Sequence, residues 1–467
     1  MDKFVIQGGP PLRGCVRCAG SKNAVLPILA ASLLTDEPLV VPNAPRVADV
    51  ASMLDVLRDL GGSAERRADG AIEVCSAQVP RCHADWNHVR KMRGSIAVLG
   101  PLLARTGRAE VSQPGGCVIG VRPIDLHLKG LRALGARVHV EHGYVVAEAP
   151  PDGLCGAEMY LGGAAGSTVL GTGNVMMAAS LARGRTVIHG AACEPEVVDL
   201  GECLVAMGAR IRGLGSPRIE IEGVERLHGT AWPVIPDRIE AGTLVIAGAM
   251  TGGAVRVEGC RPEHLMILLE RLGEAGLRFR IGSGWVETVP YDTRDRSRAP
   301  KPTDVTTLTY PGFPTDLQAQ WMALMTLADG MSLITETIYP DRYMHVAELM
   351  RMGAQIRRQG TTAIVVGPAP LSGARVMASD LRASAALVLA GLVARGVTQV
   401  HRVYHIDRGY ERIEERLQDL GAEIARVEDK DPSDDDIPVH VIQPAAAPPA
   451  AAPAAATPPQ PTPARAT

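Results

Sequence analysis

One short phrase recurs six times in this chain, and it constrains the possible fold more than any other feature. The copies read LRDLGG, LRALGA, LVAMGA, LERLGE, LMRMGA and LQDLGA. Each copy is typical of an amphipathic helix stopped by a glycine, which adopts the left-handed backbone conformation easily. The shared glycines are Gly61, Gly135, Gly208, Gly273, Gly353 and Gly421, separated by 74, 73, 65, 80 and 68 residues. Repeats of this length indicate internal duplication.

A second pattern alternates with the first. It consists of an apolar helix, a polar or glycine stop, and a strand rich in Val and Ile. It is found at 26–41, 98–111, 174–188, 243–257, 321–334 and 386–400. These helices are apolar on nearly every face, so we expect them to be buried. The two patterns predict six α/β units, each with one buried and one half-exposed helix, divided three and three near residues 228–238.

The size and charge of the chain narrow the functional classes. Its 467 residues are too many for one ordinary core, so two or three domains are expected. A net charge of −3 and only 3% aromatic residues provide neither a basic field nor stacking platforms, which argues against a nucleic-acid partner. The nine cysteines are scattered, which argues against a disulfide scaffold and favours a reducing cytoplasm.

The two ends of the sequence have different characters. The N-terminal MDKFVIQGG lacks the pattern of a signal peptide, and the apolar helices are about half a membrane span, so no membrane association is expected. An acidic run at 428–436 leads into a Pro/Ala segment at 443–467 that cannot form a core. The sequence therefore predicts a disordered tail over residues 429–467.

Charged residues gather at the N-terminal ends of the apolar helices. Phosphate-binding glycine loops and zinc spacings are absent from the sequence. The charged candidates are Lys22, Arg93, Arg122, Asp125, His127, Asp237, Arg238, Glu240, Asp316, Asp380, Arg382, Asp407, Arg408 and Arg412. If the repeats bring these ends together, their cations and free N–H groups would bind an anion. Each could equally be a linker residue, a surface ion pair or, as at Asp380, a helix cap.

Cys117 lies in the glycine-rich stretch QPGGCVIGVRP, residues 113–123. Nearby arginines and backbone N–H groups would lower the pKa of its thiol and make it reactive. The alternative is a small residue accommodated in a glycine turn. The local sequence leaves both interpretations open.

Longer motifs carry a family resemblance. GSKNAVLPILAASLL, PGGCVIGVRPIDLHLKGL, EPEVVDL, VIPDRIEAGT, GFPTDLQAQ, TETIYPDRYMHVAELMRMGA, DLRASAALVLAGL and YHIDRGYERIEERLQDLGA occur in this order. Together they resemble the enolpyruvyl transferase family over about residues 3–428. The resemblance implies a two-domain inside-out α/β barrel with six α/β repeats, three per domain, around buried helices. The first domain would comprise residues 22–230, and the second residues 1–21 plus 231–428.

The family reaction transfers the enolpyruvyl group of phosphoenolpyruvate to a hydroxyl of a uridine nucleotide and releases phosphate. The acceptor implied here is UDP-N-acetylglucosamine, in the first committed step of peptidoglycan precursor synthesis, with no metal or cofactor. The vinyl carbon must gain a proton and the hydroxyl must lose one. By resemblance, Cys117 is the covalent partner and proton donor, Asp316 accepts the hydroxyl proton, and Lys22 holds phosphoenolpyruvate.

The resemblance also implies the remaining substrate contacts. Arg122 and Arg408 would hold phosphate and carboxylate beside Lys22, and Asn23 would contact the acceptor sugar. The uracil would be held by Pro123, Ile124, Asp125, Leu126 and His127, and the other cleft residues would be Arg93, Ile338, Arg342, Asp380 and Arg382.

Two positions depart from the family pattern. Leu170 stands where the family has a small glycine, and Cys193 where it has an arginine. A bulky side chain and a lost cation would weaken a diphosphate site, so transfer to UMP or a related uridine nucleotide, as in nucleoside-antibiotic biosynthesis, is an alternative. A third hypothesis, a catalytically silent nucleotide-binding regulator, predicts loss of Lys22, Cys117 or Asp316, and all three are present. Shikimate-pathway transfer is disfavoured because that class lacks the cysteine loop.

Overall fold

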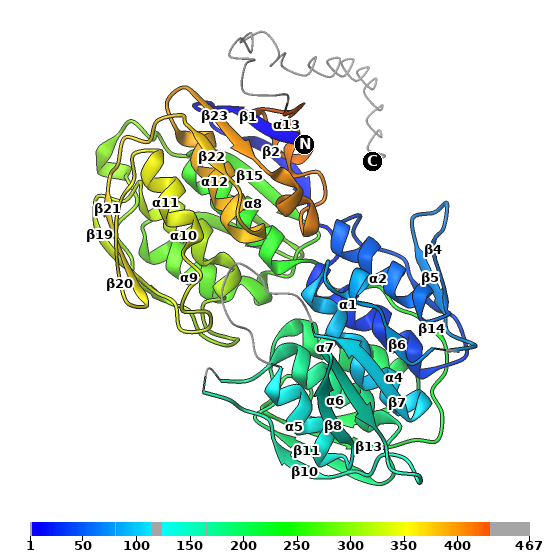
Figure 1. Cartoon of the computed structure of the whole chain (residues 1–467). Helices are drawn as coiled ribbons and strands as arrows, with labels where there is room; N and C mark the ends of the chain where they lie inside the picture. The colour runs from blue at the N-terminus through cyan, green and yellow to red at the C-terminus, as the bar shows by residue number, and fades with distance from the viewer. Residues whose placement is uncertain (1, 80, 114–123, 165, 430–467) are drawn as a thin grey trace, which may run out of the picture.

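The computed structural model describes residues 2–79, 81–113, 124–164 and 166–429. Over these residues the chain is a mixed α/β protein built from small sheets and packed helices, in two lobes (Figure 1). Cys117, Arg122 and Pro123 lie outside the described residues, as does the predicted tail beyond Asp429. No helix of the described part is long and apolar enough to cross a membrane.

The strands of the described ranges form six four-stranded sheets with one common pattern. In each sheet the first strand is parallel to the second, and the second and third are each antiparallel to the strand that follows. Three sheets have the orders β14(Thr230–Ala231)-β3(Leu39–Val41)-β5(Ile72–Cys75)-β4(Ser63–Arg66), β6(His83–Ala84)-β7(Arg108–Ser112)-β9(Tyr144–Glu148)-β8(Arg137–Glu141) and β10(Glu158–Tyr160)-β11(Arg185–His189)-β13(Arg218–Glu222)-β12(Arg210–Arg212). The other three are β2(Arg13–Arg17)-β15(Ala254–Glu258)-β17(Trp285–Thr288)-β16(Phe279–Gly282), β18(Val305–Thr306)-β19(Gly330–Thr335)-β21(Thr362–Gly367)-β20(Gln355–Gln359) and β22(Arg375–Met377)-β23(Val397–His401)-β1(Asp2–Gln7)-β24(Glu423–Glu428).

Six helices lie inside the lobes. They are α1(Lys22–Ala31), α4(Leu99–Thr106), α6(Val169–Ser180), α8(Arg238–Met250), α10(Gln318–Met325) and α12(Leu381–Val393). In α8 and α10 every residue is buried except Arg238, because apolar side chains occupy all faces of both helices. Half-exposed helices cover them: α2(Ala48–Asp59), α5(Asp125–Ala133), α7(Pro195–Ala206), α9(Met266–Glu274), α11(Met344–Arg351) and α13(Ile413–Asp419).

The repeated glycines end their helices at five of the six positions. Gly61, Gly135, Gly208, Gly353 and Gly421 all have a positive φ, between 90° and 107°. The prediction for Gly273 is wrong, because Gly273 lies inside α9. Gly276, with a φ of +79°, takes the left-handed position there, so this helix runs almost one turn further than the repeat predicts.

Two separate hydrophobic cores divide the described chain. The first contains buried residues from Ala24 to Ile235. The second contains Phe4 to Cys18 together with Ile239 to Ile424, so strands β1 and β2 belong to it.

The chain crosses between the cores twice, at residues 19–21 and 235–237, which we call the crossing segments. They run side by side: Ser21 N donates to Ile235 O at 2.7 Å, and Asp237 N donates to Ala19 O at 2.9 Å. An antiparallel bridge between Gly20 and Pro236 lies between these two bonds. The cores are therefore joined by a narrow two-stranded connection.

Candidate active site

Four helix starts meet where the two cores face each other. They belong to α1, α8, α12 and the 3₁₀ turn η5(Thr315–Leu317) that leads into α10. The Asp237 carboxylate accepts the Lys22 N–H at 3.2 Å, and Asn23 Nδ2 lies 3.5 Å from Asp316 Oδ2. Arg382 Nε lies 3.4 Å from Asp316 Oδ1. The structure thus brings together charged helix ends that are almost 360 residues apart in the sequence.

One cluster at this junction, the Asp49 triad, consists of Asp49, Lys22 and Arg408. Asp49 Oδ2 lies 2.6 Å from Lys22 Nζ, and Asp49 Oδ1 lies 3.0 Å from Arg408 Nε. Lys22 and Asp49 lie on α1 and α2, whereas Arg408 ends the turn η6(Val403–Arg408) on the second core. Burial favours the neutral carboxyl, but the two cations outweigh it and lower the pKa of Asp49. This triad is an ionic link between the cores.

Sequence reasoning did not single out Asp49. The signal available was an acidic residue in the first turn of a helix, where the helix dipole favours negative charge. That placement is common on protein surfaces. Only the structure shows that this side chain is 3% exposed and lies between two cations.

The second cluster, the Asp316 triad, consists of Asp316, Arg342 and Arg382. Arg342 Nη2 donates to Asp316 Oδ1 at 2.9 Å, and its Nη1 donates to Thr315 Oγ1 at 3.0 Å. Burial opposes the charge on Asp316, but Arg382 and Arg342 prevail and hold the pKa of Asp316 far below its usual range. Asp316 is therefore a stable carboxylate and, in this arrangement, a weak base.

A buried acidic pair lies beside the Asp316 triad. Arg238 Nε donates to Glu196 Oε1 at 2.9 Å, and Glu194 Oε1 accepts the Tyr310 N–H at 3.3 Å. The second bond joins the start of α7, in the first core, to a loop of the second. Burial raises the pKa of Glu194, and burial together with Glu194 raises the pKa of the Cys193 thiol. Cys193, which departs from the family pattern, is thus a neutral thiol next to a buried carboxyl.

Leu170 lies in the first turn of α6. The Thr168 hydroxyl caps this helix by accepting the Gly171 N–H at 3.2 Å. Leu170 is half-buried and packs against the first hydrophobic core. A capped N–H and an apolar side chain leave this helix start less suited to a phosphate group.

His127 has a packing role in the described structure. It is buried in α5, and its Nδ1 lies 2.9 Å from Asn174 Nδ2. Burial, assisted by Arg93, lowers the pKa of His127 to about 3, so the imidazole is neutral and Nδ1 accepts the amide proton. Asp125 is exposed in the first turn of the same helix, and Leu126 and Ile124 are half-buried beside the first core.

The remaining candidates have simple local roles. Asp380 caps α12, accepting the Arg382 N–H at 2.9 Å and the Ala383 N–H at 3.1 Å, as its cap interpretation predicts. Ile338 N donates to the buried Glu336 carboxylate at 2.9 Å. Arg93 begins the 3₁₀ turn η2(Arg93–Val98) that leads into α4.

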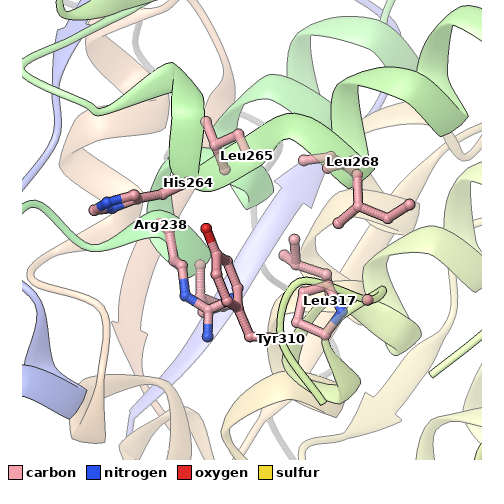
Figure 2. Close-up of a pocket in the computed structure, with 10 residues that line it drawn as sticks. Arg238, His264, Leu265, Leu268, Tyr310 and Leu317 are labelled. Atoms are coloured by element: carbon pink, nitrogen blue, oxygen red, sulfur yellow. The ribbon is translucent and has the colours of Figure 1, made fainter. Parts of the chain in front are cut away.

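Neither of two cavities near the junction is lined by a residue of the triads. Figure 2 shows the smaller one, with Arg238 and Tyr310 beside each other and leucines, including Leu265 and Leu317, around them. Its volume is about 10 Å³, enough for one water molecule. The larger cavity has a volume of about 430 Å³ and lies against the crossing segments, with Gly20 and Pro236 in its wall.

Comparisons with known proteins identify the family. The model of the family described as EPSP synthase (3-phosphoshikimate 1-carboxyvinyltransferase) matches residues 6–417. A UDP-N-acetylglucosamine 1-carboxyvinyltransferase of Coxiella burnetii is 53% identical over 91% of this chain and 96% of its own. The protein of that name from an Anaeromyxobacter species is 54% identical over 91% of this chain and 99% of its own.

A solved structure agrees with these sequences. The enolpyruvyl transferase NikO of Streptomyces tendae superimposes with a TM-score of 0.82 at 26% identity, covering 91% of this chain and 99% of NikO. The resemblance seen in the sequence motifs is confirmed over most of the chain: the protein belongs to the EPSP synthase family of enolpyruvyl transferases.

Proposed function

We propose that the protein transfers the enolpyruvyl group of phosphoenolpyruvate to a hydroxyl of UDP-N-acetylglucosamine and releases phosphate. The observation that carries this proposal is the pair of triads at the junction of the cores, since each has two cations around one carboxylate. Each triad is largely buried and keeps one net positive charge. This suits a substrate that bears both phosphate and carboxylate. The names of the relatives support the same reaction.

Phosphoenolpyruvate would bind by competing with Asp49. Its anionic groups would take over the Lys22 ammonium and the Arg408 guanidinium, with Arg122 as a further cation. Charge-assisted hydrogen bonds of this kind are about twice as strong as neutral ones. Because the bond from Asp49 to Arg408 joins the two cores, substrate binding and the relative position of the cores would be coupled.

Three proton movements complete the chemistry. The acceptor hydroxyl would lose its proton to Asp316 as its oxygen bonds to the substituted vinyl carbon, and the methylene carbon would gain a proton. Phosphate would then leave as the methyl group gives back one proton and the enol double bond re-forms. Because two arginines lower the pKa of Asp316, this carboxylate becomes an effective base only when substrate draws Arg342 or Arg382 away.

The sequence-based assignments complete the proposal. Cys117 would donate the proton and add covalently to phosphoenolpyruvate. Asn23, 3.5 Å from Asp316, is near enough to the proposed base to hold the acceptor sugar. The other proposed substrate contacts are Arg93, Pro123, Ile124, Asp125, Leu126, His127, Ile338, Arg342, Asp380 and Arg382.

We also propose the inside-out barrel architecture, with three α/β units in each of two domains, 22–230 and 1–21 plus 231–428. The common sheet pattern and the two cores support it. Val234 and Ile235 pack in the first core, so the chain leaves that core after residue 235. We place the reaction in the cytoplasm, where both substrates are made.

A smaller uridine nucleotide such as UMP is the second candidate acceptor. The apolar Leu170 at the capped start of α6 and the neutral Cys193 favour it, because neither stabilises a diphosphate. The test is phosphate release from phosphoenolpyruvate with each acceptor in turn. Turnover with UDP-N-acetylglucosamine alone supports the first proposal, turnover with UMP alone supports the second, and turnover with neither overturns both.

A further inference from the structure

The cavity behind the crossing segments, here the hinge cavity, is outside the proposed active site. Its volume is about 430 Å³, within the range of small-molecule sites. The second core contributes Arg17 and Arg416 to its wall, and the first core contributes Arg46 and Arg66. The cations proposed to hold the two substrates, such as Lys22, Arg408 and Arg382, do not line this cavity.

The charge of the hinge cavity is strongly positive. Among the described residues that line it, the four arginines face one carboxylate, Glu411. Arg416 is neutralised, because its Nη1 lies 3.2 Å from the buried Glu240. Glu411 is held in the wall because its Oε2 accepts the backbone N–H of Arg46 at 2.9 Å. The remaining charges in the wall are therefore one carboxylate, Glu411, and three guanidiniums, those of Arg17, Arg46 and Arg66.

Arg66 is held in place without a carboxylate. Its guanidinium donates to the carbonyls of Ala44 and Gly70 at 2.9 and 2.7 Å and to that of Pro45 at 3.0 Å. Burial, and then repulsion from Arg46, lowers the pKa of Arg66. Glu411 attracts both of these guanidiniums but is a single charge, so two fixed cations that share one carboxylate form a pre-organised half of an anion site.

We propose that the hinge cavity binds a small non-aromatic polyanion, of the oligophosphate class, that joins the two cores. The wall contains no aromatic side chain among its described residues, so it offers no stacking platform for a nucleobase. The guanidiniums of Arg17, Arg46 and Arg66 come from both sides of the crossing segments, so more than one anionic group is needed to engage them. Occupancy would therefore restrain the relative motion of the cores at their narrow connection.

The test is calorimetric titration of the intact protein with tripolyphosphate at fixed ionic strength. Arg17→Gln/Arg46→Gln removes two of these charges from exposed positions, and we expect it to weaken binding by about tenfold or more. The matched control is Arg212→Gln/Arg280→Gln, which removes two exposed charges from strands β12 and β16 and should leave the affinity unchanged. Absence of saturable binding to the wild type, or equal weakening in both double variants, overturns the inference.

A second arm separates this site from the proposed active site. Titration of a Lys22→Ala variant should retain the tripolyphosphate affinity of the wild type. Loss of binding in that variant alone would assign the anion to the active site and overturn the inference. None of these measurements depends on turnover, so failure of the proposed enolpyruvyl transfer would be seen separately, in the phosphate-release assay.

Discussion

The Asp49 triad and the Asp316 triad have the same composition, one carboxylate between two cations, but different positions. Lys22 and Asp49 lie on the first core and Arg408 on the second, so the Asp49 triad spans the junction. The Asp316 triad lies wholly within the second core, and only Asn23 approaches it from the first. Relative motion of the cores would break the first triad and leave the second intact. The Asp49 triad therefore depends on how the cores are arranged, whereas the Asp316 triad is a pre-formed part of the candidate site.

The largest effect should follow from Asp316→Asn. The amide keeps the shape but cannot accept the hydroxyl proton, and two arginines lose their counter-charge. We expect kcat to fall about 10²- to 10⁴-fold, the range for loss of a general base. Steady-state phosphate release measures it.

The matched control is Asp341→Asn. Asp341 is exposed and pairs with Arg358 at 3.1 Å on the surface of the same core. It should retain full activity. If Asp316→Asn is as active as this control, the pre-formed cluster has no role in proton transfer.

Asp49→Asn should lower the free energy of unfolding more than a substitution in an exposed ion pair does. It leaves Lys22 and Arg408 without their shared counter-charge at a junction where their side chains are 12% and 28% exposed. Breaking a buried pair from one side typically costs about 3 kcal/mol, and we expect urea denaturation to show a loss of this order. Asp55→Asn on the same helix breaks an exposed pair with Arg58 and should change the free energy of unfolding by less than about 0.5 kcal/mol. Equal effects would mean that Asp49 contributes no link between the cores.

Arg342→Lys should reduce the efficiency of the Asp316 triad without removing its charge. The guanidinium contacts both Thr315 and Asp316, whereas an ammonium on a flexible stem cannot reproduce this geometry. We expect kcat/KM to fall about tenfold, the loss of one good charge-assisted bond. Arg358→Lys, in the surface pair with Asp341, is the control. An unchanged kcat/KM in Arg342→Lys would show that charge alone matters here.

Asp199 shows what a buried carboxylate does without a cation. It is as buried as Asp49 but has no ion-pair partner among the described residues. It accepts the Trp232 Nε1–H at 3.0 Å and the Ile235 N–H at 3.2 Å. Burial outweighs these bonds and raises the pKa of Asp199 from 3.8 to about 6. The folded protein therefore keeps a proton that the unfolded chain releases, and this group's contribution to stability falls as pH rises from about 4 to about 6.

The corresponding experiment is thermal denaturation of Asp199→Asn at several pH values. Relative to this variant, the free energy of unfolding of the wild type should fall by about 2 kcal/mol between about pH 4 and about pH 7. Asp152→Asn, at an exposed turn, should show the same pH dependence as the wild type. A constant difference between wild type and Asp199→Asn would show that Asp199 is already ionised at low pH.

Much of the fold could be predicted because its signals are local. Apolar helices such as α8 are buried because no face of them is polar, and a glycine that must be left-handed, such as Gly135, marks the end of a helix. Gly273 failed as a marker because a second glycine, Gly276, follows three residues later and ends the helix in its place. The alternation of the two patterns gave six α/β units, but it contains no information on which strand completes which sheet.

The site was less predictable because its partners are distant in sequence. Charged helix starts identified Lys22, Asp316 and Arg382, since charge at the end of an apolar helix is unusual. They did not identify Asp49, whose local setting is that of an ordinary surface helix. They also left open whether Asp380 caps its helix, and its hydrogen bonds show that it does.

Strand β1 has a consequence for synthesis of the chain on the ribosome. It pairs with β23 on one side and β24 on the other, so β1 cannot take its place in the sheet until residue 428 has been made. The first core, which uses only residues between 24 and 235, is complete when little more than half of the chain has been translated. The order of folding is therefore set by topology: the lobe built from residues 24–235 forms first, and strand β1 waits for β24, the last strand of its sheet.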